Sequence, residues 1–473
     1  MRITPAAPIF GIYLLNIIVV MSVLTGIKLT IIIIVCSVSG GLFPIHMLAA
    51  EAAAQNALPE IARYYLKDAV NWYKQAIWAE PDWPLPYIQV MRLDLIRQDC
   101  PSALDVKNAA LKVLPRIGSV WLEAADVAEK CGRPAEQLED LRNAYHFEPT
   151  AQNAAALTYA YLTAGLPVLA LRQGLAAQQV NDAGKLYIGI AALHVGRFQI
   201  ARKIFNEIAD GAGITWFAQY QQLALQWQNS PKDMFQLGML DLSAQFPLLA
   251  AAAFTTAQKN GYTGAELAEN IAWAYWIAGN SKYAQIALAA ADPHSAKTVG
   301  LRAAIALASG QAGLAETMLQ SWLHQSGQAP AAIWLLLAQA SMQNHMYSVA
   351  EQAYWSLLRQ TDPANQYQYL VLLCHFYIQS GLGKSEPLAQ TAFYLLQHEK
   401  KLDSAGAAAL AEWLVWQGSA PAAEILLTHS IAMYPQDVSL RCAAAIFYTS
   451  IGNLDLAKAQ YALADQLSLY GCS

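Results

Sequence analysis

The sequence predicts an all-α protein, an α-solenoid in which helical hairpins are stacked along the chain. Three prolines, Pro81, Pro115 and Pro149, lie 34 residues apart. A period of this length is typical of stacked helical hairpins, none of which can bury its own apolar face alone. The residues that precede these prolines repeat with the same 34-residue spacing. The three sets are Ala69, Tyr73, Ala76; Ala103, Lys107, Ala110; and Gln137, Leu141, Ala144.

The same spacing returns near the end of the chain, and the composition agrees with it. Gly418, Ala423 and Leu427 recur 34 residues later as Gly452, Ala457 and Tyr461. Hydrophobic residues make up 56% of the 473 residues, and much of this excess is alanine, the best helix former and a residue that lets helices approach closely. Alternating strand patterns are lacking, so we expect helices and turns throughout the body.

The repeated unit resembles the tetratricopeptide repeat family. Its unit is two antiparallel helices with a small residue at their contact, a Gly-aromatic turn and a proline ending the second helix. This resemblance covers residues 60–469 and implies about twelve hairpins in a right-handed superhelix with a concave groove. The residues that carry it are Gly196-Arg197-Phe198 with Ala201 and Phe205; Gly452-Asn453-Leu454 with Ala457, Tyr461 and Ala464; Trp121 with Ala125; and Trp334 with Ala338.

The pattern divides the chain into four parts. Residues 1–52 form an apolar N-terminal segment, 53–210 and 263–473 carry repeats, and 211–262 are predicted to be an irregular helical connector. Within this connector the pattern is lost at Asn229-Ser230-Pro231 and at Gln245-Phe246-Pro247. We expect the array to bend or break there.

The N-terminal segment is predicted to insert into a membrane. Residues 9–25 and 29–50 are apolar, and uncharged runs of nearly this length are candidates for membrane spans. Three arrangements remain open: two spans, one span with Arg2 held inside, or a secretory signal read from Met21 and cleaved near Ala50-Glu51-Ala52. Export is favoured, which would place the body in the periplasm, either anchored or released.

Six cysteines allow limited disulfide bonding if the body is exported. Cys100 and Cys131 fall in the turns of adjacent repeats, where neighbouring turns lie side by side, so they are the one pair we consider bridged. Cys374, Cys442 and Cys472 show no comparable reason to meet.

Charge and motifs exclude several classes of function. The body from residue 51 onward has a net charge of about −7 and no basic run, so nucleic acid is an unexpected partner. No His-Glu-x-x-His, Cys-x-x-Cys, Gly-x-Ser-x-Gly or P-loop motif is present. We therefore expect no catalysis, no metal and no cofactor.

The family register places several aromatic and acidic residues on the face that such arrays turn toward their groove. Aromatic side chains with polar tips suit binding interfaces, although core packing is the favoured explanation for each of these positions taken singly. The predicted groove residues are Trp273, Trp276, Trp416, Tyr159, His375, Glu269 and Glu412, with Asp126 and Glu129 beside them.

These observations favour a non-catalytic scaffold of the cell envelope that binds partner proteins or peptides in its groove. The alternative is a module for glycan binding or exopolysaccharide export, with Trp273, Trp276 and Trp416 as stacking platforms for sugar rings. Nothing in the sequence distinguishes a peptide from a sugar on such a groove.

Overall fold

The structure is a computed structural model, and it describes residues 66–208, 215–326, 329–384, 387–399, 402–467 and Cys472. All of them belong to one compact unit, Ile45–Ser473. The apolar segment 1–52 and the membrane insertion predicted for it lie outside the described residues.

Within these ranges every regular element is a helix, and no strand is present. The first half contains α4 (Leu66–Ala79), α5 (Pro84–Ile96), α6 (Cys100–Val113), α7 (Gly118–Lys130), α8 (Pro134–Phe147), α9 (Ala151–Thr163), α10 (Pro167–Ala176), α11 (Asp182–His194), α12 (Phe198–Asn206), α13 (Thr215–Gln226), α14 (Pro231–Ser243) and α15 (Pro247–Lys259). The second half contains α16 (Leu267–Ile277), α17 (Ser281–Leu288), α18 (Ala296–Ala308), α19 (Ala312–Ser326), α20 (Ala331–Gln343), α21 (Tyr347–Gln360), α22 (Pro363–Ser380), the short 3₁₀ helix η1 (Leu382–Lys384), α23 (Pro387–Gln397), α24 (Ser404–Trp416), α25 (Ala420–Met433), α26 (Val438–Ser450) and α27 (Leu454–Leu467).

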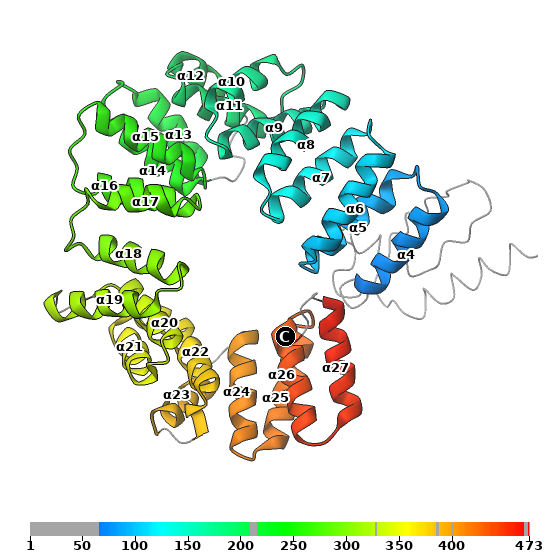
Figure 1. Ribbon diagram of the computed structural model, residues 1–473, viewed down its shortest axis with the longest axis vertical. Helices are drawn as coiled ribbons and strands as arrows, with labels where there is room; N and C mark the ends of the chain where they lie inside the picture. Colours follow the sequence, from blue (N-terminus) through cyan, green and yellow to red (C-terminus); the bar gives the residue numbers. More distant parts are fainter. Residues whose placement is uncertain are drawn as a thin grey trace, which may run out of the picture. The chain divides into compact units, whose positions relative to one another are not determined.

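Consecutive helices pack as hairpins, and each hairpin packs on the next one (Figure 1). Four pairs run from α5–α6 to α11–α12, and seven more run from α14–α15 to α26–α27. Helix α4 stands before the first pair, and α13 stands between the two sets. The predicted all-helical hairpin array is confirmed, while the right-handed twist of the superhelix stays a prediction.

The turn within each hairpin needs one residue in the left-handed region of backbone space. A glycine holds this place in most pairs, for example Gly279 at φ 75° and Gly418 at φ 74°. In three pairs a residue with a side chain holds it instead: Gln98 at φ 60°, Gln245 at φ 63° and His345 at φ 58°. These three turns are sterically less favourable than a glycine turn, because a Cβ atom crowds this conformation.

Small residues fill the contact between the two helices of a pair. The second helix of every hairpin but one carries a buried alanine as its third or fourth residue. The buried set is Ala103, Ala170, Ala201, Ala250, Ala284, Ala315, Ala350, Ala389, Ala423 and Ala457, with Ala69 at the same place in α4. The exception is α8, where Gln137 stands at this position.

The segment 211–262, expected as an irregular connector, contains one extra helix and one hairpin of the regular kind. Helix α13 is the extra element. The α14–α15 pair has Gln245 at its turn and buries Ala250, Phe254 and Ala257 as the other pairs do. The sequence pattern seemed lost there because glutamine replaces the turn glycine.

Polar contacts hold α13 and α14 in the array. The Asp241 carboxylate is fully buried, with His194 Nε2 2.9 Å from Oδ2 and the Tyr220 hydroxyl donating to Oδ1 at 2.7 Å. Arg202 on α12 donates to the carbonyl oxygens of Ala224 and Leu225, at 2.6 Å and 3.2 Å, near the end of α13. Cations stabilise a helix C-terminus because its last carbonyl groups lack partners within the helix.

Among the helices that the structure describes, none is long and apolar enough to cross a membrane.

We predict that Gly279→Ala destabilises the α16–α17 hairpin by about 1–2 kcal/mol, the cost of a left-handed conformation for a residue with a Cβ atom. A Cβ at Gly279 would meet no atom within 4 Å, so the effect is conformational and not steric. Hydrogen exchange of peptides from α16 and α17, followed by mass spectrometry, measures this local opening.

The control is Gly313→Ala in α19, where φ is not positive and the nearest atom to a Cβ would be 3.6 Å away, in the Asn344 side chain. Alanine is a better helix former than glycine, so this change should leave α19 unchanged or slightly more protected. Equal effects of the two variants would contradict the explanation of the turn.

Candidate binding site

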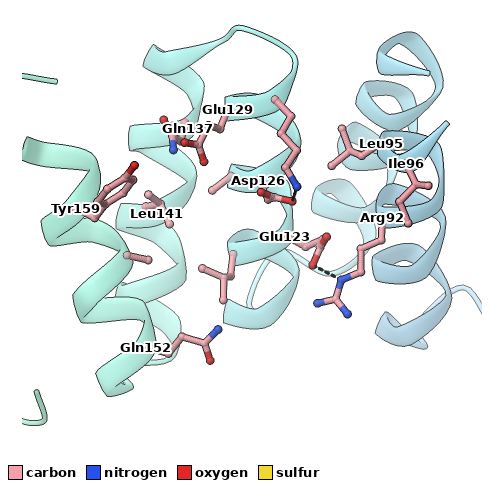
Figure 2. A pocket seen from close by; sticks show the side chains of 14 residues that line it. Arg92, Leu95, Ile96, Glu123, Asp126, Glu129, Gln137, Leu141, Gln152 and Tyr159 are labelled. Atoms are coloured by element: carbon pink, nitrogen blue, oxygen red, sulfur yellow. Dashed lines mark hydrogen bonds and ion pairs between the residues drawn. The ribbon is translucent and has the colours of Figure 1, made fainter. Parts of the chain in front are cut away.

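A pocket of about 670 Å³ opens between α5, α7, α8 and α9. Figure 2 shows its walls: Arg92, Leu95 and Ile96 from α5 on one side, Tyr159 and Gln152 from α9 on the other, and α7 between them. A pocket of this size can hold a small ligand or a few side chains of a partner. Its lining is Arg92, Leu95, Ile96, Leu122, Glu123, Ala125, Asp126, Glu129, Lys130, Gln137, Leu141, Gln152, Ala156 and Tyr159.

Helix α7 presents three carboxylates to the pocket at helical spacing, Glu123, Asp126 and Glu129 (Figure 2). Arg92 Nε donates to Glu123 Oε2 at 2.8 Å, and Lys130 Nζ lies 2.9 Å from Asp126 Oδ2. Burial raises the pKa of Glu123, and the bond from Arg92 only partly offsets this. The pKa of Glu129 is also raised, first because neighbouring groups displace its water and second because of the Asp126 charge.

Tyr159 joins the pocket to an aromatic cluster that supports α9. Its ring centroid lies 5.2 Å from that of Tyr187 on α11 and 5.6 Å from that of Phe246, at the turn before α15. Loss of water raises the pKa of both tyrosines, so both hydroxyls are neutral at physiological pH. Packing against two other elements fixes the ring that forms this wall.

A disulfide connects the two turns at one end of the pocket. Cys100 begins α6 just after the α5 turn, and Cys131 follows Lys130 at the end of α7; their Sγ atoms are bonded at 2.12 Å. This is the pair that the sequence analysis considered bridged. The bond fixes the spacing between α5 and α7, the two helices that carry most of the lining.

The sequence missed a second disulfide. Cys442 on α26 is bonded to Cys472, which follows α27, although the sequence gave no reason for them to meet. The reason lies in the last hairpin, in which α27 packs back against α26. Cys374 is buried and free.

The predicted groove residues are distributed over several helices, and only Tyr159 among the seven lines the pocket. On α16, Trp273 is exposed and Trp276 is half-buried, while Glu269 is buried and accepts a hydrogen bond from the Thr298 hydroxyl at 3.1 Å. Glu269 therefore helps to hold α16 against α18, and its carboxylate is not open to a partner.

The remaining three predicted residues lie on α22 and α24. Trp416 is half-buried and packs closely on Gly383 in η1, where an added Cβ would come within 2.5 Å of the indole ring. His375 is half-buried, and burial lowers its pKa against the opposing effect of a hydrogen bond to the backbone of Ala405. Glu412 is half-buried. Whether these side chains bind a partner stays a prediction.

Sequence reasoning missed most of the pocket. Asp126 and Glu129 were placed on the inner face, whereas Arg92, Ile96 and Glu123 were not considered. The α5 residues were hidden because Gln98 replaces the glycine that marks the turn. Gln137 could have been found, because it alone breaks the alanine rule of the second helices.

No group of three His, Cys, Asp or Glu side chains suited to a metal ion occurs among the described residues.

No protein-family model matches this chain, and no curated protein matches it. Several solved structures are similar at low identity. Yeast Tom70 is 14% identical, with 89% of this chain and 91% of Tom70 covered and a TM-score of 0.36. A tetratricopeptide repeat protein from Parabacteroides merdae is 15% identical over 63% of this chain and 99% of its own, with a TM-score of 0.29. Pseudomonas aeruginosa PilF is 15% identical, with 44% of this chain and 89% of PilF covered and a TM-score of 0.25.

Likenesses of this degree do not indicate what the chain binds. The tetratricopeptide-like character of the protein rests on its own features: the 34-residue spacing, the left-handed turns and the buried alanines of its helix pairs. It is a tetratricopeptide-like array of helical hairpins.

We predict that Cys100→Ser with Cys131→Ser loosens the pocket end of the array. Closing a loop of 31 residues stabilises a fold by about 2–4 kcal/mol, chiefly by restricting the unfolded chain. Hydrogen exchange should therefore accelerate in α5 to α8. The matched control is Cys442→Ser with Cys472→Ser, which removes a loop of nearly the same length and should affect only α26 and α27. Unchanged hydrogen exchange in α5 to α8 of the first variant would show that the Cys100–Cys131 disulfide does not stabilise this end of the array.

Proposed function

We propose that the protein is a non-catalytic scaffold that binds a segment of a partner protein in the α5–α7–α9 pocket. The observation that carries the proposal is the concentration of charge there. Five of the fourteen lining residues are charged, whereas charged residues make up 13% of the chain. Two ion pairs account for four of these charges and leave Glu129 without a salt bridge among the described residues. This concentration of charge around an open pocket, in a chain otherwise poor in charge, favours a binding role.

The surroundings of the pocket support this proposal. Affinity rises when a site is held in its binding geometry before the partner arrives, since less freedom is then lost. Three features hold this pocket: the Cys100–Cys131 disulfide, the aromatic cluster around Tyr159, and an ion network between α6 and α8. In that network Lys107 Nζ lies 2.7 Å from Asp140 Oδ2 and 2.9 Å from Glu136 Oε2, which joins α6 to α8.

We also propose that the body works in an oxidising compartment such as the periplasm, reached through the apolar segment 1–52. Disulfides persist in exported proteins and are rare in the cytosol. The two disulfides, one in the first hairpins and one in the last, agree with the N-terminal sequence. A role in the cell envelope follows from this placement.

The glycan alternative has less support. It requires exposed indole rings as stacking platforms, and the three tryptophans differ in this respect: Trp273 is exposed, Trp276 is half-buried, and Trp416 packs on Gly383. They also lie on two helices, α16 and α24, that are distant in the array. The photo-crosslinking experiment distinguishes this alternative from binding of a protein segment.

Photo-crosslinking tests the proposed site. A benzoylphenylalanine introduced at Ile96, whose side chain is 53% exposed in the pocket, should form discrete protein adducts in cells that produce the full chain. Leu175 is equally exposed, at 53%, but lies on α10 outside the pocket lining, so the same substitution there is the matched control. Identical adducts at both positions would contradict the proposal, and adducts that contain polysaccharide would favour the glycan alternative.

Thiol trapping tests the compartment. Cells are quenched in acid, and free thiols are labelled with a maleimide polymer before and after reduction. If the body is exported, reduction should expose four additional thiols per chain, those of Cys100, Cys131, Cys442 and Cys472. Full labelling without reduction would show that the body stays in a reducing compartment.

A further inference from the structure

The charges in the pocket are unevenly compensated. Glu123 and Asp126 each have a basic partner within 3 Å, but no salt bridge among the described residues reaches Glu129. Loss of water and the Asp126 carboxylate raise the pKa of Glu129, while the Lys130 charge and the Gln137 amide lower it. The α7 row therefore carries one more negative charge than the basic residues of the lining balance.

The two basic residues of the lining are held differently. The Lys130 and Asp126 side chains are 58% and 39% exposed, and such an exposed ion pair contributes little to stability, so Lys130 can turn toward water when a partner enters. Arg92 stays with Glu123, whose side chain is only 8% exposed, because its departure would leave a buried charge without a partner. The carboxylates differ: Glu123 is buried, and loss of water raises the pKa of Glu123 and of Glu129. A cation placed between α5 and α9 would stabilise the charged form of both.

An apolar wall faces this row of carboxylates. Leu95 and Ile96 on α5 present aliphatic surface, and Tyr159 presents a ring on the α9 side (Figure 2). Lysine and arginine combine a long apolar stem with a charged end, and an aromatic face attracts the same cations. The pocket therefore complements a basic side chain along its whole length, and not its charge alone.

One residue of the pocket lining, Gln137, differs from the residue found at the same position of the other repeats. The other hairpins bury alanine at the position of Gln137, whose side chain is only 8% exposed and borders the pocket beside Glu129. A buried amide is costly unless it is hydrogen-bonded, and Gln137 lies beside Glu129, whose pKa it lowers. The substitution therefore places a polar group next to the carboxylate that no salt bridge among the described residues reaches.

We propose that the partner segment is basic: it inserts a lysine or arginine between Tyr159 and the α7 carboxylates, next to an aliphatic residue on Leu95 and Ile96. This inference rests on the proposed function, since it names the chemistry of the segment that the pocket binds. Acidic and purely apolar segments are disfavoured, the first by Glu129 and the second by the loss of water from three carboxylates.

Selection from a phage-displayed library of random dodecapeptides tests this proposal on the full-length chain. Selected peptides should be enriched in lysine and arginine. Their affinity, measured by fluorescence anisotropy, should fall by about tenfold or more in Asp126→Asn with Glu129→Gln, because each change removes a charge-assisted hydrogen bond. It should also fall with added salt, since both charges lie near solvent.

The matched control is Glu139→Gln with Asp105→Asn, which also removes two negative charges, from exposed positions on α8 and α6 outside the lining. Peptide affinity should stay within about twofold, because screening at physiological salt limits distant charges. A loss as large as in the pocket variant would show that net charge, and not the pocket, recruits the peptides.

Two further outcomes separate this inference from the proposed function. Peptides that crosslink to benzoylphenylalanine at Ile96 but show no excess of lysine or arginine would overturn the basic segment and leave the binding site in place. If no selected peptide crosslinks at Ile96, both proposals fail. Circular dichroism of each variant shows whether the helices are retained, as expected for substitutions at two side chains that are not buried.

Discussion

The close approach of two antiparallel helices is the constraint on which the rest of this structure depends. A hairpin of this kind needs a residue in the left-handed region at its turn and a small residue where the helices touch. The chain meets the first need with glycine at most turns and the second with a buried alanine in all but one of its hairpins. Because each hairpin buries its apolar face on its neighbours, any change in this contact affects the packing of at least two units.

The pocket lies where this pattern is relaxed. Gln137 replaces the contact alanine, and Lys107 stands where Tyr73 and Leu141 place a large apolar side chain one unit earlier and one unit later. Burying these groups costs stability unless each finds a polar partner. Lys107 is paired with Asp140 and Glu136, and the Gln137 amide lies beside Glu129, whose pKa it lowers. Departures from local consistency are expected at functional sites, which agrees with the choice of this pocket over other parts of the inner face.

The sequence was sufficient for the helical hairpins, because the 34-residue step and the alanines are local features that repeat. It was not sufficient where a physical need is met by an unusual residue. Gln98, Gln245 and His345 occupy left-handed turns that favour glycine, so the units around them were obscured. Helix α13 follows no periodic rule, and the Cys442–Cys472 bond depends on where the last hairpin returns the chain end.

The sequence predicted less of the site than of the fold, and Trp416 and Glu269 show why. Register predicts which side of a helix faces inward, but an inward side chain is available to a partner only if its neighbours leave space. Trp416 is covered because η1 brings Gly383 against its ring, and Glu269 is enclosed because Thr298 on the next unit binds it. Tyr159 has the same register as Trp273, yet its role as a pocket wall depends on Tyr187 and Phe246, which only the folded chain brings together. Whether a partner can contact an inward side chain thus depends on three or more helices at once, whereas the repeat pattern describes one helix at a time.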